Sequence, residues 1–363
     1  MMLRLSSTRS PFRPSGGPCT VSASALAAAL LAVALSPSAA RAQATPGSPQ
    51  CPVVGNVVTC SGALPDGVAV TGGAYQGLTV SNVAGDMTAT NRPAIQYRTD
   101  QPNTTILLDD PDSAVRLTTS GNPGDSLVGA IQTILPQNGS FSLNTNLDIF
   151  VTEASGTGQR MQPFGILVAG EGGTFAITNS GDIEMRDVDF APDSASILID
   201  AFGANLVSLT NSGDLTQVNS DVSTGIFVAA DNRRVEIVNS GDILIPGNNG
   251  FSGIELAYQP TRFAPPPGGL RDVTPFTGVG GSLSYNAAPV MPLESYSIRN
   301  GGLISAEAFG IYVHTNIVDQ TGNGIGALGA PDGSIVNDGT IRATFGIAAS
   351  HSGDRNIVNN GRL

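Results

Sequence analysis

The stretch "AITNSGDIEM" at residues 176–185 is followed by "SLTNSGDLTQ" at 208–217 and by "EIVNSGDILI" at 236–245. Its shared core, Asn-Ser-Gly-Asp, therefore starts at Asn179, Asn211 and Asn239. A catalytic motif is needed once, whereas recurrence about every 30 residues is typical of stacked structural repeats. The motif therefore indicates how the chain is folded before it indicates any chemistry.

A second landmark, a small residue followed by an apolar one, precedes each copy. In three successive units the Asn follows its landmark by 14, 15 and 14 residues, and in the last unit by 13. Most landmarks are 28 to 36 residues apart, and one interval is 57. The landmarks begin at Ala94, Ala130, Gly165, Ser196, Gly225, Gly253, Gly310 and Gly346. Periods of this size predict a solenoid.

The content of each unit predicts strands. In one unit, apolar positions recur at every second residue in three short runs of about five residues: Ile166 and Val168, Phe175 and Ile177, Ile183 and Met185. Helical repeats would need longer runs at a period of 3.6, and leucine-rich repeats would need a helical stretch. We therefore predict an all-β fold, a parallel β-helix solenoid with about three short strands per coil.

The repeated letters then receive structural roles. Like positions of successive coils lie one strand spacing apart, so the asparagines are expected to form a hydrogen-bonded column: Asn179, Asn211, Asn239, Asn300, Asn337 and Asn359. The glycines two residues later are expected to turn the corner with positive φ: Gly181, Gly213, Gly241, Gly302, Gly339 and Gly361. Ser and Asp are interpreted as expendable. The Asp column of Asp182, Asp214 and Asp242 does not continue in later coils, which argues against a cation ladder.

Composition limits the classes of function. The chain has 45 Gly, 24 Pro, no Trp and no Lys, and its formal net charge is −12. The acidic balance argues against nucleic acid as a partner, because phosphate binding needs a basic face. Hydrophobic residues at 40% are sufficient for a core, and this excludes a charged disordered chain.

The N-terminal residues 1–44 have the features of a Sec-type signal peptide. Arg4, Arg9 and Arg13 precede an 11-residue apolar run at 25–35, which is too short to span a bilayer, and small residues follow it. We divide the remainder into an N-terminal capping segment, 45–93, and coils over 94–363. The mature chain is expected to be exported.

Export favours a disulfide between Cys51 and Cys60 in "CPVVGNVVTC". The two short apolar stretches on either side of a Gly-Asn turn could bring the thiols together. The alternative, a metal site, would need further Cys or His ligands, and His314 and His351 are distant in sequence. No metal and no cofactor is expected.

One long insertion interrupts the coils. Residues 259–295 are rich in Pro and Gly and lack the repeat pattern, so they are expected to leave the stack as a loop that is either a binding element or an ornament. A shorter insertion follows Val313. The chain stops at Leu363, within a coil and without a polar capping unit, so we expect it to be the front part of a longer protein.

These features together resemble the passenger region of autotransporters of Gram-negative bacteria, especially the adhesin-like kind. The resemblance rests on the leader, on "CPVVGNVVTCSG", and on units written as Gly-Ile and then Asn-x-Gly-x-Ile; it covers residues 51–363 and is strongest from Gly165. It implies a right-handed β-helix with an external ligand, namely a host surface, a polysaccharide or a neighbouring cell. It also implies cell-surface display through a C-terminal outer-membrane β-barrel, which the chain up to Leu363 does not contain. Without that barrel the product would be periplasmic or secreted.

Two stretches resemble enzyme motifs. "GDSL" at 124–127 matches a lipase and esterase block, but the Asp-x-x-His of that family is missing, since Ile311 and Ala348 stand three residues before the histidines. "LDDPD" at 108–112 is an acidic cluster that we interpret as a solvated corner. The prediction is a non-enzymatic passenger with an adhesion or interaction surface. The alternatives are a carbohydrate-active β-helix enzyme, a lyase or hydrolase, and a structural surface-layer component.

Overall fold

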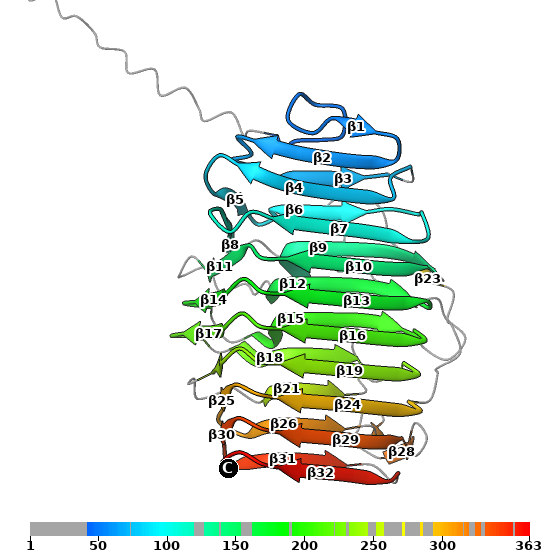
Figure 1. Cartoon of the computed structure of the whole chain (residues 1–363), viewed down its shortest axis with the longest axis vertical. Coiled ribbons are helices and arrows are strands. Elements are labelled where there is room, and N and C mark those ends of the chain that lie inside the picture. The colour runs from blue at the N-terminus through cyan, green and yellow to red at the C-terminus, as the bar shows by residue number, and fades with distance from the viewer. Residues whose placement is uncertain are drawn as a thin grey trace, which may run out of the picture. The chain divides into compact units, whose positions relative to one another are not determined.

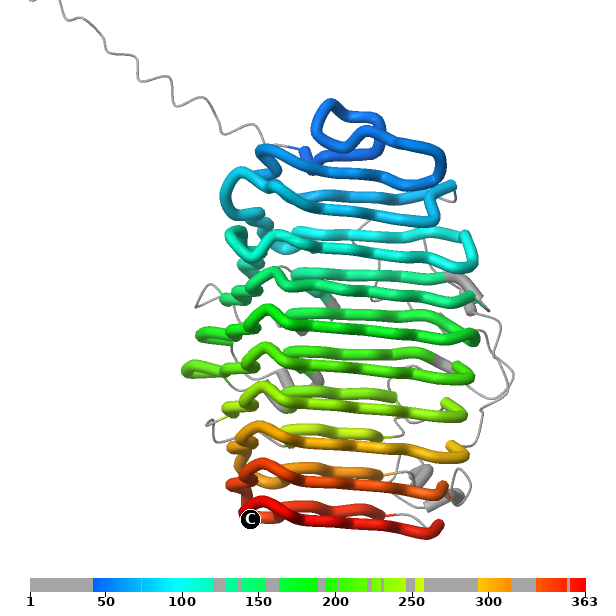
Figure 2. Tube along the Cα trace, in the orientation of Figure 1, coloured from blue at the N-terminus to red at the C-terminus, as the bar shows by residue number. Residues whose placement is uncertain are grey.

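The computed structural model describes residues 42–363 apart from 73, 120–126, 138, 154–161, 189–190, 221, 230–231, 246–251, 258–270, 273–283, 286–292, 315, 319–323, 328–330 and 351–352. The described residues form strands and turns, and no helix is found among them. Strands of successive coils lie one above another, from β2 at one end to β32 at the other (Figure 1). The Cα trace in Figure 2 follows the same repeated path through each coil.

Three long sheets make up the coils. The asparagine sheet contains β1 (Val53–Val54), β2 (Val57–Gly62), β4 (Gly77–Val83), β7 (Thr104–Asp109), β10 (Ser140–Thr145), β13 (Thr174–Asn179), β16 (Leu206–Asn211), β19 (Arg234–Asn239), β24 (Ser295–Asn300), β29 (Asp332–Asn337) and β32 (Arg355–Asn359). The short-strand sheet contains β5 (Met87–Thr90), β8 (Ala114–Thr119), β11 (Asp148–Glu153), β14 (Ile183–Arg186), β17 (Leu215–Val218), β20 (Ile243–Leu244), β25 (Leu303–Ser305) and β30 (Thr340–Arg342). The landmark sheet contains β3 (Val68–Thr71), β6 (Ile95–Arg98), β9 (Leu127–Gln137), β12 (Gln162–Glu171), β15 (Ala191–Phe202), β18 (Val222–Ala229), β21 (Ser252–Ala257), β26 (Phe309–His314) and β31 (Phe345–Ser350).

Pairing within the three sheets is parallel except between β1 and β2. The chain visits the asparagine, short-strand and landmark sheets in turn and then begins the next coil. This is a parallel β-helix, so the predicted fold class is confirmed. Two antiparallel pairs lie outside the coils: β22 (Arg271–Asp272) with β23 (Ser284–Tyr285), and β27 (Asn316–Val318) with β28 (Gly324–Ala327).

The landmark register predicts the pairing of the landmark sheet. Each apolar residue of a landmark pairs with the next, in the column Ile95, Ile131, Ile166, Ile197, Ile226, Ile254, Ile311 and Ile347. The landmark residue that precedes each of these isoleucines also faces the interior, where there is room only for a small side chain. A Cβ on Gly165 would lie 2.6 Å from Cγ2 of Ile183, inside the 3.0 Å that real Cβ atoms keep.

The coils begin earlier than the predicted boundary at residue 94. β2, β3 and β5, all inside the predicted capping segment 45–93, pair in parallel with β4, β6 and β8. Val58, Val68 and Met87 fill the interior like the later apolar residues. The early coils lack the Gly-Ile and Asn-Ser-Gly-Asp spellings, so the sequence pattern did not reveal them.

The six predicted asparagines form one column. Each Nδ2 from Asn179 to Asn337 donates to Oδ1 of the next Asn, at 2.7 to 2.9 Å. Each also donates to the carbonyl oxygen two residues on, for example from Asn179 to Gly181 at 2.8 Å. Asn179, Asn211, Asn300 and Asn337 are fully buried, so these bonds satisfy amides that would otherwise lose their solvation.

The column has an unsatisfied end at Asn179. Its Oδ1 is buried and accepts no hydrogen bond from the described residues. The register partner above it is Thr145, whose Oγ1 accepts from the backbone N–H of Leu147 at 3.2 Å. The column continues upward through Leu108 and Val80 to Cys60. Cys60 forms a disulfide with Cys51, and both cysteines are fully buried.

The predicted reason for the corner glycines is wrong. None of the six, all within the described residues, has positive φ. They are needed because neighbouring backbones approach too closely: a Cβ on Gly213, Gly241 or Gly302 would overlap the carbonyl oxygen of the glycine in the preceding coil. Among the described non-glycine residues, positive φ occurs after short strands at Asn91, Asp187 and Asn219 and also at Asn82 and Asn103, where short polar side chains tolerate it.

The Ser and Asp side chains of the motif make hydrogen bonds between coils. The backbone N–H of Asp182 donates to Oδ1 of Asp148 at 3.0 Å, and the backbone N–H of Asp214 donates to Oδ1 of Asp182 at 2.8 Å. Asp214 and Asp242 continue the series to the N–H of Leu303. The serine hydroxyls donate weakly to carbonyls of the preceding coil, as from Ser180 to Thr145 at 3.3 Å. The Asp column therefore binds backbone and joins coils.

Some predicted features lie outside the described residues. They include residues 1–41 of the leader, Gly124 to Ser126 of "GDSL", His351 and most of the 259–295 insertion. Beyond the β22–β23 pair, the insertion is described again from Leu293, which is buried in the core.

We expect Thr145→Asn to stabilise the fold. The new amide can donate to the unpaired Oδ1 of Asn179, while its own Oδ1 replaces the hydroxyl as acceptor for Leu147. The gain should be about 1 kcal/mol in the free energy of unfolding, measured by chemical denaturation. Thr145→Val is the control and should give no gain; equal stability of the two variants would contradict the unsatisfied-acceptor argument.

Adjacent glycines test the close-approach argument. Gly302→Ala should lower the free energy of unfolding by about 3 kcal/mol, because its Cβ would overlap the Gly241 carbonyl. At Gly301 the nearest atom to an added Cβ is 3.7 Å away, so Gly301→Ala should change stability by less than about 0.5 kcal/mol. Both free energies of unfolding would be measured by chemical denaturation. Similar decreases in the two variants would show that glycine is needed for its conformational freedom and not for the close approach of the neighbouring backbone.

Candidate functional site

The three corners of the coil differ in how much the length of the connecting segment varies from one coil to the next. From β10 to β29, the connection between the asparagine sheet and the short-strand sheet always has two or three residues. The connections that lead from the short-strand sheet into the landmark sheet have 2 to 8 residues. Those that lead from the landmark sheet to the asparagine sheet have 2 to 37. Binding residues are found disproportionately on variable segments held by a rigid scaffold. The landmark sheet is therefore the place to look for a site.

The outer face of the landmark sheet is apolar and buried over β9 to β21. Leu167 and Ala169 alternate with the interior residues Ile166 and Val168, so they point outward, yet they are buried. They belong to a second apolar cluster, separate from the interior core: Ile134, Phe164, Leu167, Ala169, Ala195, Leu198, Phe227, Ala229 and Ala257. Burial on both faces distinguishes this sheet from an ordinary solvated face.

Aromatic rings follow this cluster on β26 and β31. Phe309 stacks on Tyr312, with ring centroids 4.4 Å apart and an interplanar angle of 17°. Tyr312 stacks on His314 at 5.6 Å and 14°, and Phe309 stacks on Phe345 at 5.1 Å and 23°. Offset stacking of this kind fixes the rings relative to one another. The four rings form one rigid aromatic row on the outer face.

A buried carboxyl lies at the edge of the aromatic row. Glu255 on β21 is the register partner of Tyr312, and its Oε2 accepts hydrogen bonds from Thr224 Oγ1 at 3.1 Å and Ser252 Oγ at 3.2 Å. Glu255 is 8% exposed. Burial raises the pKa of its carboxyl, and the two hydroxyl donors offset only part of that effect.

The neighbouring titratable groups are shifted as well. Burial raises the pKa of Tyr312, and the negative charge of Glu255 raises it further. Burial lowers the pKa of His314, which favours the neutral imidazole. Perturbed pKa values of grouped side chains are typical of functional sites. We call Thr224, Ser252, Glu255 and the four rings of the aromatic row the acid–aromatic patch.

Exposure increases across the patch toward β31. Ser252 is fully buried, its register partner Phe309 is half-buried, and Phe345 is 56% exposed. In the parallel row, Ala257 is buried, His314 is half-buried and Ser350 is exposed. The patch is therefore approached from the β26 and β31 side.

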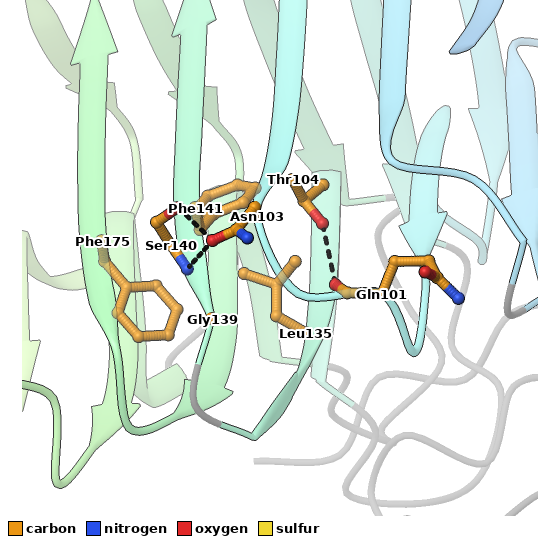
Figure 3. Close-up of a pocket in the computed structure, with 8 residues that line it drawn as sticks. All are labelled: Gln101, Asn103, Thr104, Leu135, Gly139, Ser140, Phe141 and Phe175. Atoms are coloured by element: carbon orange, nitrogen blue, oxygen red, sulfur yellow. Dashed lines mark hydrogen bonds between the residues drawn. The ribbon is translucent and has the colours of Figure 1, made fainter. Parts of the chain in front are cut away.

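A small hollow lies elsewhere, at the corner between the landmark and asparagine sheets (Figure 3). It is lined by Gln101, Asn103, Thr104, Leu135, Gly139, Ser140, Phe141 and Phe175. Asn103 Oδ1 accepts from Ser140 Oγ at 2.8 Å, and Thr104 Oγ1 donates to the carbonyl oxygen of Gln101 at 3.1 Å. Its empty space, including the open mouth, is about 200 Å³, below the range of small-molecule sites.

The acidic stretch "LDDPD" at 108–112, interpreted from the sequence as a solvated corner, is partly buried. Asp109 is exposed, but Asp110 is buried, and its Oδ2 accepts from the backbone N–H of Val83. Asn146 connects the two residues: its Oδ1 accepts from the N–H of Asp110 at 2.9 Å, and its Nδ2 donates to Asp109 at 2.7 Å. The "LDDPD" stretch is thus a structural corner held by a buried carboxylate, not a solvated one.

The sequence pattern contained the patch, but it was not recognised. Glu255 and Tyr312 occupy the third position of the landmarks "GIEL" and "GIYV", which the register places outward. The same position holds Leu167, Leu198 and Phe227 in earlier coils. The constant letters of the landmark set the register of the strands, whereas the third letter changes from coil to coil. That varying letter marks the outer face.

Comparison with protein-family models, with curated proteins and with solved structures finds no match to this chain. Among the described residues, no three His, Cys, Asp or Glu side chains are grouped so that they could hold a metal ion. The described part of the chain also offers no helical segment of the length and apolarity that a membrane crossing requires.

Glu255→Gln should change stability in a pH-dependent way. Below the ordinary carboxyl pKa of 4.5, both the folded and the unfolded wild type carry the proton, so burial costs nothing. Above it the unfolded carboxyl ionises freely while the folded one resists, so wild-type stability falls as the pH rises. The variant should match the wild type near pH 4 and have a higher Tm near pH 8.

The control for this measurement is Glu307→Gln, which removes the same charge from an exposed position in the β26 coil. It should lack the stabilisation near pH 8. Equal pH profiles for wild type and Glu255→Gln would contradict the buried-acid argument.

Proposed function

We propose that this chain is an exported passenger of the adhesin-like autotransporter kind, displayed at the cell surface, which binds an external partner without catalysis. The outer face of the landmark sheet is its binding face. The observation that supports this most directly is the contrast between the constant asparagine corner and the variable connections around the landmark sheet. A constant scaffold with one variable face is the arrangement of a recognition module.

The content of the patch favours binding over hydrolysis. Glycoside hydrolysis by acid–base chemistry uses two carboxyl groups about 5 to 9.5 Å apart. Among the residues of the acid–aromatic patch, Glu255 is the single carboxyl group. Aromatic side chains with a few polar groups are instead enriched where proteins recognise partners.

Matched substitutions on two faces test this function. Ala348→Arg places a bulky side chain on the outer face of the landmark sheet, and Thr178→Arg places the same side chain on the asparagine sheet. Adhesion of the displayed chain to host cells, polysaccharide and neighbouring bacteria would be measured, with circular dichroism to verify the fold. We expect Ala348→Arg to lower adhesion by about tenfold and Thr178→Arg to leave it unchanged.

Two results would contradict the proposal. Unchanged adhesion in both variants would remove the landmark sheet as the binding face. Products released from a polysaccharide panel by the wild type, and lost in Glu255→Gln, would favour the carbohydrate-active enzyme instead.

A further inference from the structure

We infer that Asn103 is a modification site, at which an N-linked glycan is attached to the nitrogen of the side-chain amide. The inference goes beyond the proposed binding function and rests on one part of it, the export of the chain. The site lies on the connection between β6 and β7, at the corner from the landmark sheet to the asparagine sheet.

The first step is the local sequence. The acceptor pattern for N-glycosylation is Asn-x-Ser/Thr without Pro in the middle, and it is typical of surface segments of secreted proteins. The stretch Asn103-Thr104-Thr105 has this pattern, and Asn138-Gly139-Ser140 is the one further copy in the chain. The six column asparagines lack it, because Gly stands two residues after each of them. Asn138 lies outside the described residues, so Asn103 is the copy that the structure places.

The second step is the orientation of the Asn103 amide. The residue is exposed, directly precedes β7, and has a φ of 60°. Its Oδ1 accepts hydrogen bonds from Oγ and the backbone N–H of Ser140, at 2.8 and 3.4 Å (Figure 3). Its Nδ2 donates to no acceptor among the described residues. The amide is therefore held by its oxygen and open at its nitrogen, which is the atom that a glycan would occupy.

The column asparagines show the opposite arrangement. Nδ2 of Asn179 donates to the carbonyl oxygen of Gly181 and to Oδ1 of Asn211, both at 2.8 Å and both in the interior. A sugar on that nitrogen would break one of these bonds and would need space in the core. A sugar on Asn103 breaks no described hydrogen bond, and the contact with Ser140 remains because it uses Oδ1.

The third step is the access to the whole acceptor pattern. Thr105 lies on the outer face of β7 and is exposed, while its backbone N–H is bonded to the carbonyl oxygen of Gln76 at 3.0 Å. Asn103 also lines the small hollow, beside the apolar side chains of Leu135 and Phe141. Because a glycan is bulky and solubilising, a glycan on Asn103 places a hydrated group beside this apolar lining.

The modification is a group transfer from a sugar that is activated on a phosphate. Nδ2 attacks C1 of the sugar, so an N–C1 bond forms, the C1–O bond breaks, and the phosphate-containing group leaves with the electron pair. The proton that Nδ2 loses passes to a base of the transferring enzyme, a glycosyltransferase of the producing cell. The donor is either a nucleoside diphosphate sugar or a lipid-linked oligosaccharide.

The test is mass spectrometry of the full chain purified from the cells that produce it. Trypsin separates the two acceptor patterns, because cleavage after Arg98, Arg116 and Arg160 gives peptides 99–116 and 117–160. We expect peptide 99–116 to carry a mass increase of one or more sugar residues, located on Asn103 by fragmentation that retains the glycan. A single sugar supports the inference with a nucleotide-activated donor, and an oligosaccharide supports it with a lipid-linked donor.

Substitutions distinguish modification from a structural role. Thr105→Ala should lose the glycan although Asn103 and its contact with Ser140 stay in place, and Thr105→Ser should retain it. Asn205→Gln is the matched control: Asn205 is exposed and precedes β16 at the same corner, but Leu-Val follows it. This variant should leave the glycan on Asn103 unchanged. Circular dichroism would verify the fold of each variant.

An exported chain whose peptide 99–116 is unmodified, or a glycan that persists in Thr105→Ala, would overturn the inference. Cell fractionation separates this failure from that of the proposed function. An exported chain with unmodified Asn103 removes the glycan and leaves the passenger proposal intact. An unmodified chain that stays in the cytoplasm overturns the export on which both depend.

Discussion

The asparagine column is the constraint on which the coil depends. From β10 to β29, the chain must turn at one corner within two or three residues and return to the same register. The buried amide makes this possible because it has donors for two acceptors, the carbonyl two residues on and the next amide along the column. Gly supplies the space, since any Cβ there would overlap the backbone of the preceding coil. The Asp carboxylates add a third series of bonds between coils.

A corner fixed in this way allows the rest of the coil to vary. Once register is set at the asparagine sheet, insertions at the edges of the landmark sheet do not shift the stacking, because strands on both sides of an insertion regain the same partners. β21 and β26 are separated by the 258–308 segment, yet Ile254 pairs with Ile311 as regularly as Ile226 pairs with Ile254. Structural specificity and variability are thus located on different faces of one solenoid.

The parts of the structure that could be predicted from sequence are those that repeat. The column positions of Ile and Asn follow from spacing alone, because a repeated letter in a stack has to meet itself. The physical reason for a letter is harder to predict: Gly213 is as compatible with positive φ as with close approach, and only the backbone positions distinguish them. Single positions are hardest. Asp110 in "LDDPD" has the local signs of a solvated turn, and its burial depends on Val83, 27 residues earlier.

Glu255 belongs to this last group, and its environment shows why it is unusual. Its neighbours in the outward row are Phe227 and Tyr312, and the preceding coils have Leu198 and Leu167 at that position. An apolar residue would continue the outer cluster without loss, so stability alone favours Leu over Glu here. The hydroxyls of Thr224 and Ser252 are placed to bond the carboxyl, which means that three residues from two strands are committed to keeping a costly acid in place. The two hydroxyl donors reduce the cost of burying this acid, and desolvation still raises its pKa.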